Sequence, residues 1–132
     1  MIGRFAILAG RIRQDLTEIE RIVARAERAV LAARQHDVNQ DLFVDSAALN
    51  LHDAYSSIER LLEQIASSVD QSVPSTHDWH RELLKQMTVE VPGLRPQVLS
   101  GTTTTALDEY RRFRHVVRNL YAFALDPVRT NG

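Results

Sequence analysis

The sequence of 132 residues contains no cysteine. This absence excludes a disulfide scaffold, a thiol nucleophile and every zinc or iron-sulfur site built from thiolates. Glycine and proline are scarce, with 5 and 4 residues, while 44% of the residues are hydrophobic. A chain of this composition and length is neither collagen-like nor disordered, and it has room for one hydrophobic core. We therefore predict a single domain over residues 1–132.

The chain also lacks a long hydrophobic run, a glycine-rich phosphate loop, an HExxH metal motif and a serine in a nucleophile-elbow context. The apolar stretch at the start is too short to span a membrane, and it continues into an arginine-rich helical pattern without a cleavage site. We expect a cytoplasmic protein with no membrane partner. Enzyme classes that need the missing motifs are unsupported.

Neither sign of charge dominates, since the formal net charge is -1, but the charges are unevenly distributed. Residues 1–34 carry seven basic and four acidic side chains, residues 35–96 carry four and ten, and residues 97–132 carry five and three. An anionic polymer could therefore bind local patches rather than the protein as a whole. All but one of the 16 basic residues are arginine, which binds phosphate through a planar fork, although genome composition produces the same bias.

Hydrophobic periodicity predicts an all-α fold, because apolar residues recur every three or four positions and no β alternation or internal repeat is present. Two long N-terminal helices, over about 2–34 and 41–69, are separated by a short loop and should form an antiparallel hairpin. A short helix is expected around residues 79–87. A last helix, capped by Thr104, should end before Asp126 because a proline follows. We predict an antiparallel helical bundle.

Each long helix has an apolar stripe that we expect to face the core. The stripe of the first helix consists of Phe5, Leu8, Ile12, Leu16, Ile19, Val23, Ala26, Val30 and Ala33. That of the second consists of Leu51, Ala54, Tyr55, Ile58, Leu61, Leu62, Ile65 and Ala66. That of the last consists of Leu107, Tyr110, Phe113, Val117, Leu120 and Ala124.

The densest polar chemistry lies in residues 110–121, YRRFRHVVRNLY, where four arginines and a histidine fall within eight positions. Helical spacing creates two polar rows, one of Arg114, Arg118 and Tyr121 and the other of Arg111, His115 and Asn119. One interpretation is a solvated helix face whose arginines pair with the acidic residues of the middle segment. The other is a phosphate-binding strip with a proton-transfer residue and a phenol at its edge.

The remaining histidines are His36, His52, His77 and His80. Two of them, His77 and His80, have the i, i+3 spacing that brings two rings together on a helical turn, as in some metal sites. A third ligand is not visible in the sequence. Surface or capping roles are favoured, and we predict no metal site and no cofactor.

The last helix resembles the motif of the HEPN superfamily, in particular of HepT-like ribonuclease toxins that are encoded beside a minimal nucleotidyltransferase antitoxin. That motif is Arg, a polar residue, three further residues, His, any residue and Tyr, and Arg114, His115, Asn119 and Tyr121 fall on its positions. The likeness extends over nearly the whole chain, including residues 55–62, 79–87, 92–96 and 107–117. It implies a HEPN-type fold and a homodimeric, metal-independent RNA endonuclease that cleaves tRNA or mRNA, the toxin of a type VII-like toxin-antitoxin pair.

The resemblance also implies roles for individual residues. Arg114 would hold the scissile phosphate and stabilise its growing charge, with Arg111, His115 and Arg118 completing the RNA-binding surface. Homodimerisation would bring two such motifs to one cleft. Tyr121 would be the hydroxyl to which the antitoxin attaches AMP, which adds negative charge where RNA must bind.

The chain departs from this pattern at one position, because Asn119 stands where the motif has its catalytic histidine. An amide neither accepts nor delivers a proton near neutral pH, whereas imidazole does both. We therefore expect impaired catalysis, unless His115 acts instead. The matching surroundings favour a deliberate replacement over a natural inactive variant. Two further functions stay open: a non-catalytic HEPN adaptor that binds RNA or a nucleotidyltransferase, and a helical interaction module with no nucleic-acid role.

Overall fold

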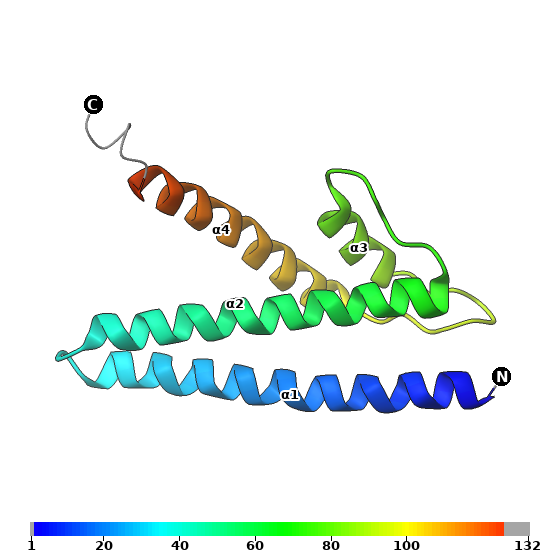
Figure 1. Ribbon diagram of the computed structural model, residues 1–132, viewed down its shortest axis with the longest axis horizontal. Coiled ribbons are helices and arrows are strands. Elements are labelled where there is room, and N and C mark those ends of the chain that lie inside the picture. The colour runs from blue at the N-terminus through cyan, green and yellow to red at the C-terminus, as the bar shows by residue number, and fades with distance from the viewer. Residues whose placement is uncertain (1, 126–132) are drawn as a thin grey trace. The chain divides into compact units, whose positions relative to one another are not determined.

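The computed structural model describes the backbone of residues 2–125 and the side chains of residue 3 and residues 5–114. In this part of the chain it contains the helices α1 (Ile2–Gln35), α2 (Gln40–Ile65), α3 (Trp79–Met87) and α4 (Gly101–Leu125), with a π-helical turn, η1 (Ala66–Asp70), directly after α2 (Figure 1). Within residues 2–125 no strand is formed, and the only β pairing is an isolated bridge between Val91 and Arg95. The predicted all-α fold is confirmed.

The chain divides into two compact units, Met1–Ser68 and Val69–Gly132. The first contains α1 and α2, and the second contains α3 and α4. The prediction of one domain over residues 1–132 stays a prediction. Among the described residues, no helix combines the length and the apolar character needed to cross a membrane.

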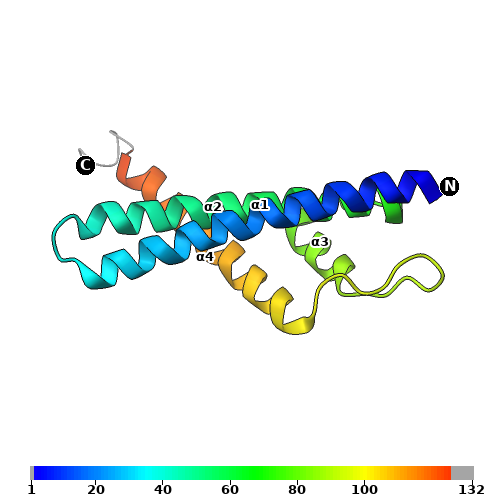
Figure 2. The ribbon, with the colours of Figure 1, turned by 90° about the horizontal axis from the view of Figure 1, so that it is seen from below.

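The first unit is the predicted antiparallel hairpin, in which α1 and α2 pack along their lengths (Figures 1 and 2). Small side chains are prominent among its buried residues: Ala26, Ala29 and Ala33 in α1, and Ala47 and Ala54 in α2. At the turn Asn39 adopts a left-handed backbone with φ 62°, which asparagine tolerates better than most residues. The Gln40 amide then donates a hydrogen bond of 2.7 Å to the carbonyl of Ala33.

The buried stripe of the hairpin is narrower than the sequence predicts. Leu8, Ile19 and Ala26 are buried as expected, but Phe5 and Leu16 are 44% and 46% exposed. In α2, Leu51 is also exposed. An apolar stripe can span more than about 100° of a helix, whereas packing against one neighbour covers mainly its centre. Periodicity therefore identified the correct side of each helix but not how much of that side is buried.

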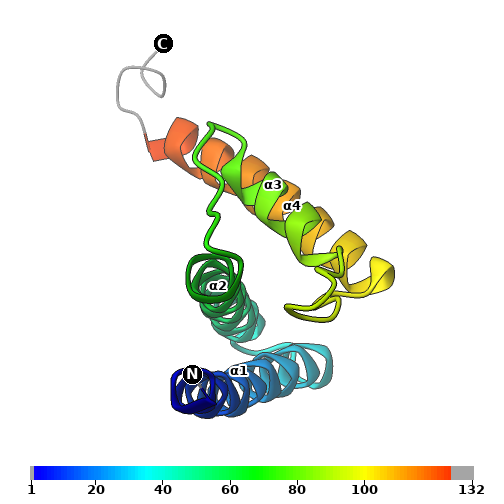
Figure 3. The same cartoon turned by 90° about the vertical axis from the view of Figure 1, so that its right-hand side faces the viewer.

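In the second unit α3 packs against α4 (Figure 3). Leu83, Leu84 and Met87 are the buried residues of α3. Residues 88–100, here called the connection, then lead to α4. The connection makes a tight turn at Val91–Leu94, closed by a hydrogen bond of 3.0 Å from the Leu94 N–H to the Val91 carbonyl. Gly93 has φ 78°, the conformation that a type II turn requires at its third position and that glycine adopts without strain.

The start of α4 corrects one sequence prediction. Thr104 is not the helix cap: the helix begins at Gly101, and the hydroxyl oxygen of Ser100 accepts a hydrogen bond of 3.1 Å from the Thr103 N–H. The hydroxyls of Thr104 and Thr105 instead donate to the carbonyls four residues earlier. Threonine satisfies its hydroxyl in this way inside a helix, so the run of four threonines belongs to the first turns rather than to a loop.

Candidate functional site

The predicted site residues all belong to α4, whose backbone is helical without interruption from Gly101 to Leu125. The helical spacing on which the two polar rows depend therefore holds for the backbone. The side chains of Arg111 and Arg114 are described, and both residues are half-buried. The side chains of the other predicted site residues, His115, Arg118, Asn119 and Tyr121, lie outside the described residues, as do those of Val117, Leu120 and Ala124.

Two arginines of α4 pair with a carboxylate of the same helix. Arg111 contacts Asp108 with N–O distances of 3.0 Å from its Nε and 2.9 Å from its Nη2. Arg112 reaches the second oxygen of Asp108 at 3.4 Å. One interpretation of the sequence paired these arginines with acidic residues of the middle segment. The structure pairs both of them with Asp108, an acid three or four positions away. Short helical spacing makes this pairing possible without ordering any distant segment.

The half-buried face of α4 also differs from the predicted core stripe. Phe113 was expected in the core but is 66% exposed. Leu107 and Tyr110, which also belong to the predicted stripe, are half-buried, and so are Arg111 and Arg114, which follow Leu107 at i+4 and i+7. Phe113 lies roughly 100° from Arg114 around the helix, because each residue advances by that angle. Two guanidinium groups therefore share a sheltered face with a leucine.

The pair His77 and His80, which the sequence singled out, lies outside α4. His77 is exposed, and His80 is half-buried with its ring 3.5 Å from the Trp79 ring, measured between centroids. Among the side chains that the structure describes, no group of three or more histidine, aspartate or glutamate residues is placed to hold a metal ion.

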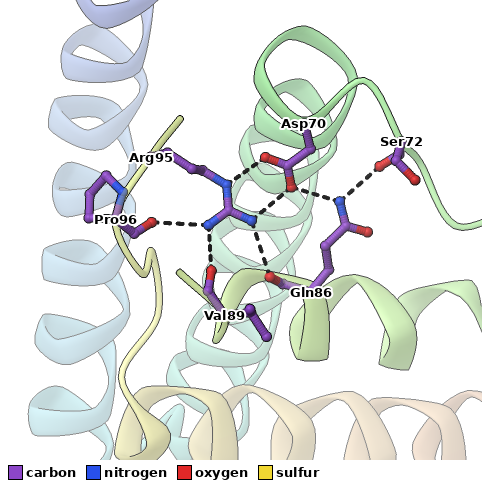
Figure 4. Close-up of polar contacts among 6 residues, drawn as sticks. All are labelled: Asp70, Ser72, Gln86, Val89, Arg95 and Pro96. Atoms are coloured by element: carbon purple, nitrogen blue, oxygen red, sulfur yellow. Dashed lines mark hydrogen bonds and ion pairs between the residues drawn. The ribbon is translucent and has the colours of Figure 1, made fainter. Parts of the chain in front are cut away.

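A second polar centre, which the sequence did not reveal, lies in the Val69–Gly132 unit (Figure 4). The Arg95 guanidinium forms a bidentate ion pair with Asp70, with distances of 2.5 Å from Nε to Oδ1 and 2.7 Å from Nη2 to Oδ2. Its remaining N–H groups donate to the carbonyls of Gln86, Val89 and Pro96 at 3.2, 2.7 and 3.0 Å. All five donors of this guanidinium are therefore satisfied.

The Gln86 side chain completes this centre. Its amide donates to Asp70 Oδ2 and to the Ser72 carbonyl, both at 2.8 Å. We call Asp70, Gln86 and Arg95 the polar cluster. The side chains of Arg95 and Asp70 are only 6% and 7% exposed.

The cluster changes the acid-base properties of its ion pair. The hydrogen bonds from Arg95 lower the pKa of the Asp70 carboxyl below its ordinary value; burial opposes this effect and the bond from Gln86 reinforces it. The same bonds raise the pKa of Arg95. Both groups are therefore charged at neutral pH.

Sequence reasoning missed the polar cluster because its ion pair joins residues 25 positions apart. One local signal was present. Arg95 follows the Pro92-Gly93 pair, which marks a turn, and an arginine held in a turn can meet distant carbonyls. The sequence gives no indication that Asp70 is its partner.

Comparison with known proteins supports the likeness seen in the sequence. The family model described as HepT-like protein matches residues 46–131, which include most of α2, all of α3 and α4, and the polar cluster. Searches of the curated proteins and of the solved structures returned no match. Since the family model covers well over half of the sequence, the chain belongs to the family of HepT-like proteins.

Proposed function

We propose that the chain is the toxin subunit of a type VII-like toxin-antitoxin pair, a homodimeric HEPN ribonuclease controlled by a nucleotidyltransferase antitoxin. The observation that carries this proposal is the family match over residues 46–131, which includes the whole uninterrupted helix α4 with Arg114, Asn119 and Tyr121 in the motif spacing. Family membership by itself does not determine activity, so the proposal depends on the chemistry of these residues.

The proposed reaction is a transesterification within RNA. The 2'-oxygen attacks the adjacent phosphorus, the bond from phosphorus to the 5'-oxygen breaks, and that oxygen leaves with a proton. One group must remove the proton from the 2'-hydroxyl and another must deliver one to the leaving oxygen, and each such step contributes about 10²–10⁴ in rate. The reaction needs no metal when cationic side chains stabilise the charge that develops on the phosphate.

Arg114 is the proposed phosphate ligand. It is half-buried, as is Arg111 one helical turn earlier. A guanidinium in a sheltered position interacts more strongly with a phosphate than a fully solvated one does, because solvent and salt screen it less. Its planar fork can also bind two phosphate oxygens at once. We assign Arg111, His115 and Arg118 to the rest of the RNA-binding surface.

Asn119 occupies the position of the proton-transfer histidine. Since an amide does not titrate near neutral pH, the chain in this form should bind RNA better than it cleaves it. The resulting loss should be of the size that one acid or base contributes, about 10²–10⁴ in rate.

A second copy of the chain is the proposed partner that completes the site. One helix offers little surface for an extended RNA strand, whereas two helices related by a two-fold axis would double the basic surface. The 66% exposure of Phe113, beside Arg114, supports an α4-centred contact, since a large aromatic ring gains free energy when a partner covers it.

Tyr121 is the proposed site of control by the antitoxin. AMP attached to its hydroxyl would add a negatively charged phosphodiester and a bulky nucleoside on the row that also holds Arg114 and Arg118. Like-charge repulsion and steric exclusion would then keep RNA phosphates away from the cleft. Tyr121→Phe should prevent this modification without removing the aromatic ring.

Restoration of the histidine tests the proposed reaction. We expect Asn119→His to produce cleavage of total RNA that persists in the presence of a chelator, and growth arrest in cells that is relieved by the nucleotidyltransferase. Asn119→Gln is the matched control, since it changes the side chain without adding a titratable group. A restored activity that the chelator abolishes would contradict the metal-independent mechanism.

The departure at Asn119 also favours one alternative function, a non-catalytic HEPN adaptor that binds RNA or a nucleotidyltransferase. An adaptor would bind RNA, lose affinity when Arg114 becomes alanine, and stay inactive when Asn119 becomes histidine. If the chain binds no RNA even at low salt, both nucleic-acid functions fail. A helical interaction module would then account for the fold.

A further inference from the structure

We propose that Arg95 is a positioning residue that fixes the start of α4 and, through the rigid helix, the motif residues that α4 carries. The importance of this role for catalysis rests on the proposed function. The structural role does not, because it concerns how the connection is held against α3. The two parts can therefore be tested separately.

The contacts of Arg95 join three segments of the Val69–Gly132 unit. Asp70 ends η1, Gln86 belongs to α3, and Val89 and Pro96 belong to the connection, as Arg95 itself does. Each segment receives at least one N–H from the same planar group. Because the donors of a guanidinium have fixed directions, satisfying all of them at once specifies one arrangement of the three segments.

The hold on the connection continues from Arg95 to α4. The N–H groups of Val98 and Leu99 both donate to the Met87 carbonyl at 3.0 Å, and the Leu99 side chain is buried. Ser100 follows directly and caps α4 through Thr103. The backbone on both sides of Arg95 is also constrained, since Val91 and Arg95 exchange two hydrogen bonds of 3.0 Å. No long unattached stretch separates Arg95 from the first turn of α4.

A purely stabilising role would not require this geometry. Replacing a buried ion pair by hydrophobic residues of similar volume is often neutral for stability, or even favourable. Arg95 does more than pair with Asp70, since three of its N–H groups donate to backbone carbonyls, one in α3 and two in the connection. A lysine at this position would keep the charge but could not reproduce five donors in a plane. The structure thus assigns the cluster to orienting α4.

Amide hydrogen exchange tests the structural part. In Arg95→Lys we expect the amides of Val98, Leu99, Thr103 and Thr104 to exchange about tenfold faster than in a control of equal global stability, since exchange reports local opening. Leu84→Ala is that control, with each protein measured at a denaturant concentration that gives the same global stability, because it removes a buried side chain of α3 and none of the hydrogen-bonding groups of the connection. Equal exchange at these four amides in the two variants would overturn the proposal.

A double replacement, Asp70→Leu with Arg95→Met, keeps the test decisive if Arg95→Lys does not fold. It removes both charges at once and so leaves neither one unpaired in the interior. We expect this protein to unfold at a denaturant concentration close to that of the parent, yet to show the same fast exchange at the four amides. Parental exchange rates in the double variant would mean that the cluster only stabilises, and the proposal would be wrong.

The functional part uses the chain with the restored histidine. There Arg95→Lys should lower kcat by about 10²-fold with little change in KM, because a displacement of catalytic groups of about 1 Å costs that much in rate. An unchanged kcat alongside faster exchange would reject the link to catalysis. If Asn119→His itself shows no cleavage, the proposed reaction fails, and hydrogen exchange still decides whether Arg95 positions α4.

Discussion

Inside each of the two units of this chain, a different kind of contact stabilises the structure. In Met1–Ser68 two long helices pack through small apolar side chains, and the buried polar residue Asn50 donates hydrogen bonds to Ser46 in its own helix. In Val69–Gly132 a buried ion pair links segments 25 positions apart, and a connection without regular secondary structure leads into the helix of the candidate site.

This difference shows which kind of order each unit can provide. Apolar packing between helices tolerates substitutions, because several combinations of side chains fill the same volume. Several hydrogen bonds from one planar group do not tolerate substitution of that group, since they depend on direction as well as distance. The proposed catalytic residues lie on α4, the helix that follows the connection held by the hydrogen bonds of Arg95. Four predictions, from the largest expected effect to the smallest, test whether the two units differ in this way.

Loss of a buried polar partner should affect the two units unequally. Asp70→Ala leaves the Arg95 guanidinium buried without its counter-charge, and we expect the free energy of unfolding to fall by about 3–5 kcal/mol. Asn50→Ala removes only hydrogen bonds within one helix and should cost about 1 kcal/mol. Urea denaturation measures both. Equal losses would show that the units do not differ in how much they depend on polar contacts.

Added volume should affect the hairpin. Ala29 is 8% exposed, and Ala29→Leu should lower the free energy of unfolding by about 1–3 kcal/mol because the extra carbons overpack the contact between α1 and α2. Arg28→Leu, at the exposed neighbouring position, is the control and should lie within about 0.5 kcal/mol of the parent protein. Thermal and chemical denaturation can be compared. A tolerated Ala29→Leu would mean that the two helices do not depend on their small residues.

The cap of α4 should have a local effect. Ser100→Ala removes the acceptor for the Thr103 N–H and should cost about 1 kcal/mol. The neighbouring exposed Thr102→Ala, which leaves that bond intact, is the control. Circular dichroism during thermal unfolding gives the stability, and amide exchange should show the loss at the first turn of α4. A uniform loss of protection over both units would contradict a local cap.

The smallest effect is a pH dependence. The pKa of Asp70 is lowered in the folded protein, so its contribution to stability is present above its usual pKa and is lost as the pH falls through the folded value. Below about pH 4, near the usual pKa of aspartate, the stability difference between the parent protein and Asp70→Asn should therefore narrow. Denaturation of both proteins across the acidic range measures this difference. A constant difference would contradict the charged pair.

Most of the helical architecture could be predicted from the sequence because it depends on local periodicity. The bounds of α1, α2 and α3 agree with the apolar pattern to within a few residues. The errors arose where neighbouring structure decides the outcome. Leu16 and Phe113 are both apolar and in phase with their predicted stripes, yet they are 46% and 66% exposed. The run of threonines after Ser100 has the composition of a loop, but the hydroxyls of Thr104 and Thr105 donate to carbonyls of the preceding helical turn.

Less of the site could be predicted, for a different reason. The resemblance to HEPN proteins placed the motif positions on the last helix, and α4 is helical over these positions, while the roles of the residues stay a prediction. Asp108 pairs with Arg111 and Arg112 because these residues are close in sequence, yet the more distant acids seemed equally available from composition. The polar cluster depends on tertiary folding, which brings Asp70 to Arg95. Sequence periodicity does not predict a contact between residues so far apart.

The shared carboxylate of Asp108 has one more consequence. Arg111 and Arg112 already have an anionic neighbour, so an anion that approaches these guanidinium groups also meets the like charge of Asp108. The carboxylate that holds the two arginines therefore also weakens the positive potential that they present to an approaching anion.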